Sequence, residues 1–283
     1  MIKRTVLALL LALLTIPMMA DGRRFTLVID AGHGGHDFGA PGAVTNEKTL
    51  TLRYALAFGR MVEERCPDVR VIYTRKRDVF IKLIDRAEIA NRNKADLFMS
   101  FHINAVEGNR SARGFQTWTL GRGASTGNKG IMENLDVAKR ENSVILMEKD
   151  YKQVYKGIDQ NSAESDIMFE FIADKNRERS VELARLMQRE VCRATGRINA
   201  GAHQNNLAVL RLSSMPSCLL ELGFISTPDE ERFLNSDAAL TLYTQGIFNA
   251  FLQYKMRFAD KITVPYKADD NTPRALPQIV PDE

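Results

Sequence analysis

The stretch "RFTLVIDAGHGGHDFGAPG", residues 24–42, decides the fold. Its first seven residues, Arg24–Asp30, form a short apolar run with β-branched members, which predicts a buried strand. The chain then enters "AGHGGHDFGAPG", residues 31–42, in which five glycines predict a long loop dominated by backbone groups. We therefore expect a strand that feeds a glycine-rich loop at its carboxyl end.

The segments that follow alternate between the two kinds of secondary structure. Asn46 can cap a helix, and the apolar spacing over 47–64 predicts that helix. A strand over 69–75, an amphipathic helix over 83–93 and the strand "DLFMSFHINA" over 96–105 come next. Strands that alternate with helices need crossover connections, so the pattern predicts a largely parallel sheet.

The second half of the chain is interrupted by a segment of different composition. From about 121 to 165 a glycine-rich turn, the charged run "ENLDVAKRENSVILMEKDY" and further turn residues predict an inserted helical subregion. After it we expect a helix over 165–195, strands in "LAVLRL" (207–212) and "SCLLELGFIS" (217–226), and a last helix over 237–258. The predicted architecture is a single α/β domain over 24–258, with a mostly parallel twisted sheet flanked by helices.

Both ends of the chain differ from this domain. Residues 1–20 combine Lys3 and Arg4 with a short apolar run and a small residue, Ala20, which indicates a secretory signal peptide. The apolar run is shorter than the roughly 20 residues that span a bilayer, so we expect export and no stable membrane span after cleavage. Prolines among charges predict a disordered tail over 261–283.

The remaining composition is that of an ordinary globular protein. Three widely spaced cysteines indicate buried thiols and not a disulfide framework. The net charge of +4 is spread over helices among acidic residues, which argues against nucleic-acid binding.

Polar residues follow three of the predicted strands. His33 comes just after the first strand, His102 ends "SFH" and Glu221 ends "CLLE", while Glu47 begins the first helix. Ligands of open α/β sheets gather at the carboxyl ends of the strands. Two imidazoles and one carboxylate can hold a catalytic zinc ion with one position left for water, and a separate carboxylate such as Glu221 can transfer the proton.

Each of these residues also has an ordinary structural explanation. A histidine in a glycine-rich loop usually bonds to the backbone, and Glu47 at a helix start is favoured by the helix dipole. A carboxylate after consecutive apolar residues, as at Glu221, needs a partner. From the residues alone, the sequence indicates only a plausible hydrolase.

At these residues the sequence resembles the zinc-dependent N-acetylmuramoyl-L-alanine amidases of the AmiC type, the Amidase_3 family. The blocks that carry the resemblance are "IDAGHGGHDFGAPG", "NEK", "TRKRD", "DRAEIANRNKADLFMSFHINA" and "VLRLSSMPSCLLELGFISTPDE". The resemblance runs from about Phe25 to Tyr254, with an interruption in the insertion. It implies metal ligation by His33, Glu47 and His102, and acid/base catalysis by Glu221.

The same resemblance implies a function and possible partners. It implies hydrolysis of the amide between N-acetylmuramic acid and L-alanine in peptidoglycan, in the periplasm or outside the cell, for wall remodelling and daughter-cell separation. Some members of the family carry a helical insertion that covers the metal until an activator protein displaces it. By analogy, Glu141 or Glu148 would supply an extra carboxylate to zinc; the alternative is a solvated helix that binds substrate or packs on the sheet edge.

Two histidines and one loop residue stand outside this pattern. His36 falls at a variable position of the family loop, so we do not expect it to bind metal. His203 precedes a predicted strand, where it would face the cleft or be an ordinary surface or core residue. Ala31 stands where the family commonly has proline, which alters loop stiffness and leaves the chemistry intact.

Two other functions remain open. The chain could be a catalytically inactive peptidoglycan-binding regulator, although all four expected active-site positions are filled. It could also be a zinc hydrolase of another amide, such as a peptide bond of the stem, which only the family resemblance argues against.

Overall fold

The computed structural model describes residues 24–121, 140–148 and 163–259. Within them the strands form one sheet in the order β2-β1-β3-β6-β4-β5. Their bounds are β1 Phe25–Ala31, β2 Val69–Tyr73, β3 Leu97–Asn104, β4 Phe115–Leu120, β5 Asn199–Asn205 and β6 Ser217–Phe224. Every neighbouring pair is parallel except β4 and β6. The expected mostly parallel sheet is confirmed.

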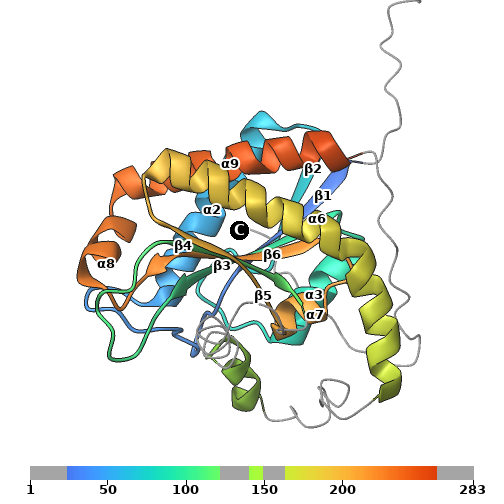
Figure 1. Cartoon of the computed structure of the whole chain (residues 1–283), viewed down its shortest axis with the longest axis horizontal. Coiled ribbons are helices and arrows are strands. Elements are labelled where there is room, and N and C mark those ends of the chain that lie inside the picture. The colour runs from blue at the N-terminus through green and yellow to red at the C-terminus, as the bar shows by residue number, and fades with distance from the viewer. Residues whose placement is uncertain (1–23, 122–139, 149–162, 260–283) are drawn as a thin grey trace, which may run out of the picture.

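Helices cover both faces of this sheet (Figure 1). The upper face in that view carries α2 Glu47–Arg65, α6 Ala163–Thr195 and α9 Asp237–Phe258, and the lower face carries α3 Leu83–Arg92 and α7 Ala208–Arg211. The short helix α8 Pro228–Leu234 lies at one end, and the described part of the insertion contains the 3-10 helix η1 Val144–Met147. Because both faces are covered, β1, β3 and β6 are buried along their whole length.

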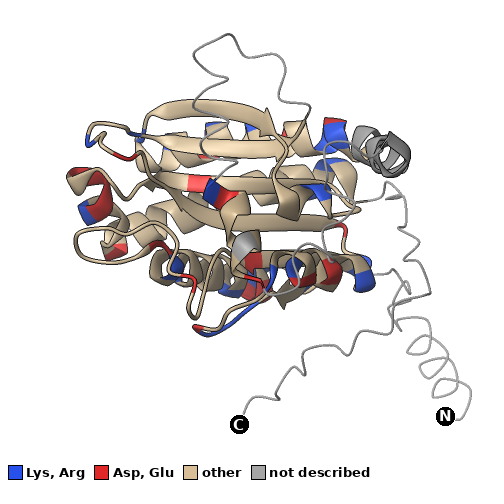
Figure 2. Cartoon of the chain, turned by 90° about the horizontal axis from the view of Figure 1, so that it is seen from below, with Lys and Arg blue, Asp and Glu red and all other residues tan. Residues whose placement is uncertain are grey.

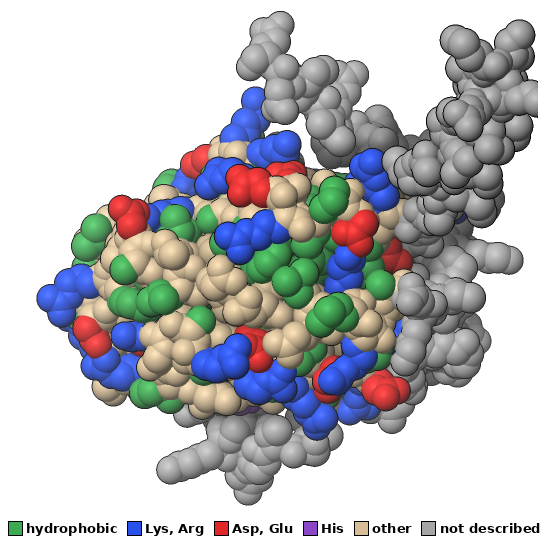
Figure 3. Space-filling view, turned by 90° about the horizontal axis from the view of Figure 1, so that it is seen from above, with side chains coloured by type: hydrophobic (Ala, Val, Ile, Leu, Met, Phe, Trp, Pro, Cys, Tyr) green, Lys and Arg blue, Asp and Glu red, His purple; other side chains and the backbone are tan. Residues whose placement is uncertain are grey.

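Two apolar clusters, one on each face, hold the layers together. The larger cluster joins side chains such as Phe58 of α2 and Phe251 of α9 to the sheet, and the smaller one gathers Trp118, Leu207 and Val144. Charged residues lie mostly on helices and loops (Figure 2), and both signs are interspersed over the α6 and α9 face (Figure 3). Cys66 and Cys218 are buried and Cys192 is partly buried, and all three are free thiols.

One predicted strand is wrong. "LAVLRL" contains the short helix α7, and its residues 207–210 are all buried against the lower face of the sheet. A short, wholly apolar run has no periodicity that separates a strand from a buried helical turn. The strands β4 and β5 and the helix α8 were not predicted. The expected signal peptide, the expected tail and most of the insertion lie outside the described residues.

Candidate metal centre

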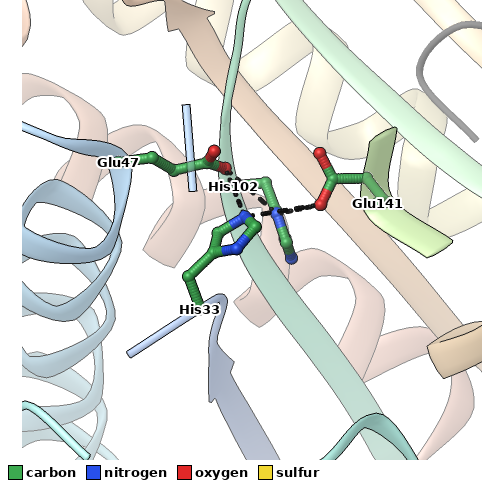
Figure 4. A group of neighbouring side chains, drawn as sticks. All are labelled: His33, Glu47, His102 and Glu141. Atoms are coloured by element: carbon green, nitrogen blue, oxygen red, sulfur yellow. Dashed lines mark hydrogen bonds and ion pairs between the residues drawn. The ribbon is translucent and has the colours of Figure 1, made fainter. Parts of the chain in front are cut away.

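Four side chains from four distant segments meet at the carboxyl end of β1 and β3. His33, Glu47, His102 and Glu141 are all buried, and one possible ligand atom of each lies within 4.8 Å of the others (Figure 4). Oε1 of Glu47 is 3.1 Å from Nε2 of His33 and 3.1 Å from Nδ1 of His102. Oε2 of Glu141 lies 2.8 Å from the same His102 nitrogen and 3.5 Å from the His33 nitrogen.

The loop that carries His33 is fixed by two buried cations, Arg75 just after β2 and Arg86 in α3. His33 has a positive φ of 60°, which is uncommon for a residue other than glycine. Arg86 donates to the carbonyls of Ala31 and His33, and Arg75 donates to those of Ala31 and Gly32. A Cβ at Gly32 would lie 2.5 Å from the His102 ring, so glycine is required where this loop crosses β3. These contacts place both imidazoles side by side.

The orientation of His33 is set by Asp37 of the same loop. Nδ1 of His33 lies 2.9 Å from Oδ2 of Asp37, so Nε2 is the nitrogen that faces Glu47 and Glu141. A carboxylate behind a histidine is the usual outer partner of a metal-binding imidazole. Burial alone would lower the pKa of His33, but Glu47 and Asp37 outweigh it and raise that pKa well above 6.5.

Glu47 is held at both carboxylate oxygens although it is the first residue of α2. Oε2 accepts from the backbone N–H of Ala40, and Oε1 accepts from that of Ile103. Burial raises its pKa, yet His33 and His102 lower it by more, so the group stays ionised in this arrangement. The side chain therefore presents a negative charge to two histidines.

Glu221 lies on β6 directly opposite His102 of β3. It is fully buried, and burial raises its pKa to about 8 against the opposing effect of Arg140. Oε1 accepts a hydrogen bond of 3.0 Å from Nη2 of Arg140. Arg140 also donates to Oε1 of Glu141 and to the carbonyl of Ala105, so it joins the insertion to this edge of the sheet.

Glu141 and Glu148, the two insertion residues considered as additional metal ligands, lie at different sites in the structure. Glu141 lies in the group of four, and its pKa is lowered well below the ordinary value because His102 and Arg140 outweigh the effect of burial. Glu148 is buried elsewhere, with its Oε2 4.0 Å from Nζ of Lys82. The structure thus brings Glu141, and not Glu148, to the expected metal ligands.

The other two histidines lie outside this group. His36 is exposed, and its ring packs on Phe80 with centroids 4.1 Å apart. His203 lies within β5, where it stacks on Trp118 and bonds through Nε2 to the carbonyl of Ala200. The ordinary structural explanation therefore holds for His203 in this structure.

Three residues with direct contacts at the site were not predicted. Asp37 could have been suspected, because it follows His33 by four residues in the same glycine-rich loop. Arg140 offers no such signal among the many charges of the insertion. In the sequence, Arg86 is indistinguishable from the exposed charged residues of an amphipathic helix, yet its side chain is almost fully buried beneath the loop.

Comparisons with known proteins agree on one family. The family model described as N-acetylmuramoyl-L-alanine amidase, Amidase_3, matches residues 27–253. The amidase AmiA of Escherichia coli (strain K12) is 30% identical over 237 residues, covering 82% of this chain and 78% of the relative. AmiC of Neisseria meningitidis serogroup B is 29% identical and covers 83% of this chain and 53% of its own length.

Solved structures give the same result for the fold. The N-acetylmuramoyl-L-alanine amidase from Clostridium difficile 630 superposes with a TM-score of 0.61 at 26% identity, over 84% of this chain and 100% of that one. AmiC2 of Nostoc punctiforme, at 24% identity and a TM-score of 0.59, covers 83% of this chain and shares the fold.

Proposed function

This chain belongs to the N-acetylmuramoyl-L-alanine amidase family, and from that premise we propose that it uses zinc to cleave the amide between N-acetylmuramic acid and L-alanine in peptidoglycan. In this proposal His33, Glu47 and His102 hold the metal, and Glu221 transfers the proton. Family membership supports the peptidoglycan amidase activity itself. The geometry of the described residues supports the division of roles.

The observation that carries the proposal is the meeting of His33, Glu47, His102 and Glu141, whose possible ligand atoms all lie within 4.8 Å of one another. Nε2 of His33 and Oε2 of Glu141 are buried and make ion-pair contacts, but neither forms a hydrogen bond of normal geometry among the described residues. Oε2 of Glu221 is also buried without a hydrogen bond there. Buried polar groups are normally paired, and a group without a hydrogen-bond partner calls for an explanation such as an ion. Imidazole and carboxylate are donors that suit zinc, so the residues present fit that metal.

The chain's own residues prepare both halves of the reaction. When bound by three protein groups, zinc supplies an acidified water and polarises an amide carbonyl. Asp37 keeps Nε2 of His33 directed to the metal position, and Glu47 adds a negative charge. Glu221, whose burial raises its pKa toward neutrality, can accept a proton and pass it to the departing nitrogen.

We also propose that this arrangement is a resting state. Glu141 would occupy the position that substrate needs at the metal, and Arg140 would occupy a carboxylate oxygen of Glu221. A partner protein that displaces the insertion would then activate the enzyme. Deletion of residues 121–162 tests this: higher wall-degrading activity supports inhibition by the insertion, whereas lost activity with retained fold indicates a structural role.

The cellular setting belongs to the proposal as well. We propose that residues 1–20 direct export, that the enzyme acts in the periplasm or outside the cell, and that it serves wall remodelling and daughter-cell separation. No helix among the described residues is long and apolar enough to span a membrane. The mildly basic chain, with a pI near 8.9, is compatible with an anionic wall.

Two measurements on the mature protein test the activity. Bound-metal analysis should find zinc, and mass spectrometry of digested sacculi should find peptides that begin with L-alanine, separated from glycan. Peptide fragments still joined to glycan would indicate a hydrolase of another amide. Zinc with no cleavage before or after deletion of the insertion would favour a regulator that binds peptidoglycan.

A further inference from the structure

The residue after Glu141 makes a paired contact with the loop before α7. Nδ2 of Asn142 donates to the carbonyl of Asn206 at 3.0 Å, and Oδ1 of Asn142 accepts from the N–H of Ala208 at 2.8 Å. One carboxamide therefore satisfies one backbone acceptor and one backbone donor at the same time. We call the carbonyl of Asn206 and the N–H of Ala208 the amide slot.

The amide slot presents the backbone hydrogen-bonding groups that an edge strand offers to a neighbouring strand. Its two groups flank Leu207, which is extended with φ −84° and ψ 124°. A carbonyl and an N–H on either side of one extended residue can bond to the N–H and C=O of a single residue in a neighbouring extended peptide. The carboxamide of Asn142 carries the same donor and acceptor as that peptide backbone.

The slot is close to the proposed chemistry. Asn142 directly follows Glu141, which lies in the group with His33 and His102. Adjacent residues therefore hold the metal position and the slot. A stem peptide, which spans at most about 3.3–3.6 Å per residue, can reach the slot within its first few residues. Arg140, Glu141 and Asn142 thus occupy the Glu221 carboxylate, the metal position and the slot in turn.

We propose that the amide slot binds the backbone of the stem peptide, and that Asn142 fills the slot in the resting state. This inference rests on the proposed amidase function. Asn206 is exposed, so a peptide can approach the slot from solvent once Asn142 leaves. Pairing through backbone groups engages the N–H and C=O of the peptide and does not require a particular side chain.

A substitution that removes the backbone N–H of Ala208 tests peptide binding at the slot and should disturb the rest of the structure little. Ala208 is the first residue of α7, a position where proline is well tolerated, and Leu207 already has the extended conformation that a residue before proline adopts. We compare Asn142→Ala/Ala208→Pro with Asn142→Ala/Ala208→Gly, because glycine keeps the N–H. Both variants leave the slot without its resting occupant.

The kinetic readout is the split between KM and kcat on a soluble muramoyl peptide. One lost hydrogen bond changes affinity by roughly 3- to 10-fold, so the proline variant should show a KM higher by about that factor than the glycine variant. Its kcat should stay within about twofold, and bound zinc and melting temperature should match. An equal KM in the two variants would overturn the proposal that the amide slot binds the stem peptide.

A second measurement leaves the protein unchanged apart from Asn142→Ala. Muramoyl peptides in which an ester replaces one stem amide lack the N–H that would donate to Asn206. The amide of the first stem residue is the bond that the enzyme cleaves, so it is kept. An ester at the second or third stem residue should raise KM by about 3- to 10-fold, whereas an ester further along should not. Equal KM values for all these substrates would overturn the inference even if Ala208→Pro does not fold.

The outcomes separate the slot from the proposed function. No cleavage of any muramoyl peptide by wild type or variants would overturn the amidase proposal, and the slot with it. If muramoyl peptides are cleaved with a KM that changes neither with the Ala208 substitution nor with the ester substitutions, the proposal of peptide binding at the slot is overturned and the amidase proposal stands. If Ala208→Pro instead weakens only the binding of a partner protein, the stem peptide is the wrong occupant.

Discussion

Two buried glutamates beside the candidate metal ligands have pKa values shifted in opposite directions. Burial raises the pKa of Glu221 to about 8, and the nearby carboxylates of Glu141 and Glu47 add to the effect of burial. Glu141 has its pKa lowered, because it faces His102 and Arg140. A carboxylate poised near neutral pH suits proton transfer, whereas one that stays ionised suits contact with a cation.

The first prediction concerns Glu221. Glu221→Gln keeps the shape of the side chain but cannot accept the proton, so we expect kcat to fall by about 10²- to 10⁴-fold with zinc retained. Bound-metal analysis and turnover of muramoyl peptide check both parts. His102→Ala is the comparison, since it should lose metal and activity together. Near-full activity of the Gln variant would show that the proton is transferred by another group.

At this scale the sequence predicts some residues better than others. His33, His102 and Glu221 stand at strand ends, so position alone makes them candidates. Glu47 looks like an ordinary helix-start charge, and only the family resemblance singled it out. Its burial depends on the N–H of Ile103, 56 residues further along the chain, which no local pattern reports.

The insertion segment 140–148 is the element on which the proposed regulation depends. It is anchored by Val144, which is buried among Trp118 and Leu207, and by the polar contacts of Arg140 and Asn142. Its place over the candidate ligands would make displacement of the segment a requirement for substrate access. The cost of displacement is the sum of these contacts, so each of them should affect resting activity.

The second prediction separates the two carboxylates of this segment. Glu141→Gln removes the negative charge that forms ion pairs with His33 and His102, and a polar contact to a charged group contributes about 1.5–3 kcal/mol. We expect resting activity on sacculi to rise by about 10-fold or more. Glu148→Gln makes the same chemical change at a buried site beside Lys82 and should have a much smaller effect.

The result is read against the metal content of each variant. Equal zinc in wild type and both variants, with activity raised only by Glu141→Gln, supports inhibition through the metal position. If Glu141→Gln lowers activity and zinc together, Glu141 is a permanent ligand and the insertion is part of the working site.

Elements differ in how far the sequence predicts them. Long periodic segments such as α2 and α9 begin and end close to their expected bounds. β5, with the sequence "NAGAHQN", has small and polar residues because it is an edge strand, so it carries no alternating apolar signal. Its pairing with β4 is decided by distant packing under α6.

Over the whole molecule, one buried ion pair and its hydrogen bonds link β1, β3, α3 and the residue that follows β2. Asp30 accepts from Thr74, Ser100 and Arg86 at 2.6, 2.7 and 2.8 Å. Burial raises the pKa of Asp30, but Arg86 and the two hydroxyl groups outweigh it, and the pKa is lowered below 3.8. Asp30 is the second-last residue of β1, and its partners join β1 to α3, to β3 and to the chain just after β2.

The third prediction follows from the sign of that shift. Because the pKa of Asp30 is lower in the folded state, its stabilisation is complete above about pH 4 to 5 and is lost as the pH falls through the folded-state value. Asp30→Asn should lower the free energy of unfolding at pH 7 by about 3–5 kcal/mol, since Arg86 is left buried without its counter-charge. The free energy of unfolding of Asp30→Asn should also fall less than that of wild type as the pH is lowered.

Urea unfolding from pH 7 down to pH 3 checks both statements. Asp229→Asn is the matched control, because Asp229 pairs with Arg113 at the exposed surface and should change stability little. An Asp30→Asn protein as stable as wild type, with the same acid dependence, would mean that Arg86 finds another partner.

The fourth prediction treats the metal as a ligand of the native fold. His33, Glu47 and His102 come from segments that are apart in the unfolded chain, so a metal that they hold binds only the folded state and stabilises it by mass action. At a free zinc concentration about 1,000 times Kd this is about 4 kcal/mol, which for a domain of this size shifts Tm by about 8–16 °C. Chelation should lower Tm by that amount, and zinc should restore it. His102→Ala should have a low Tm that neither chelation nor added zinc changes. If chelation leaves the wild-type Tm unchanged, these three residues do not hold a metal that stabilises the fold, and this conclusion does not depend on the activity measured.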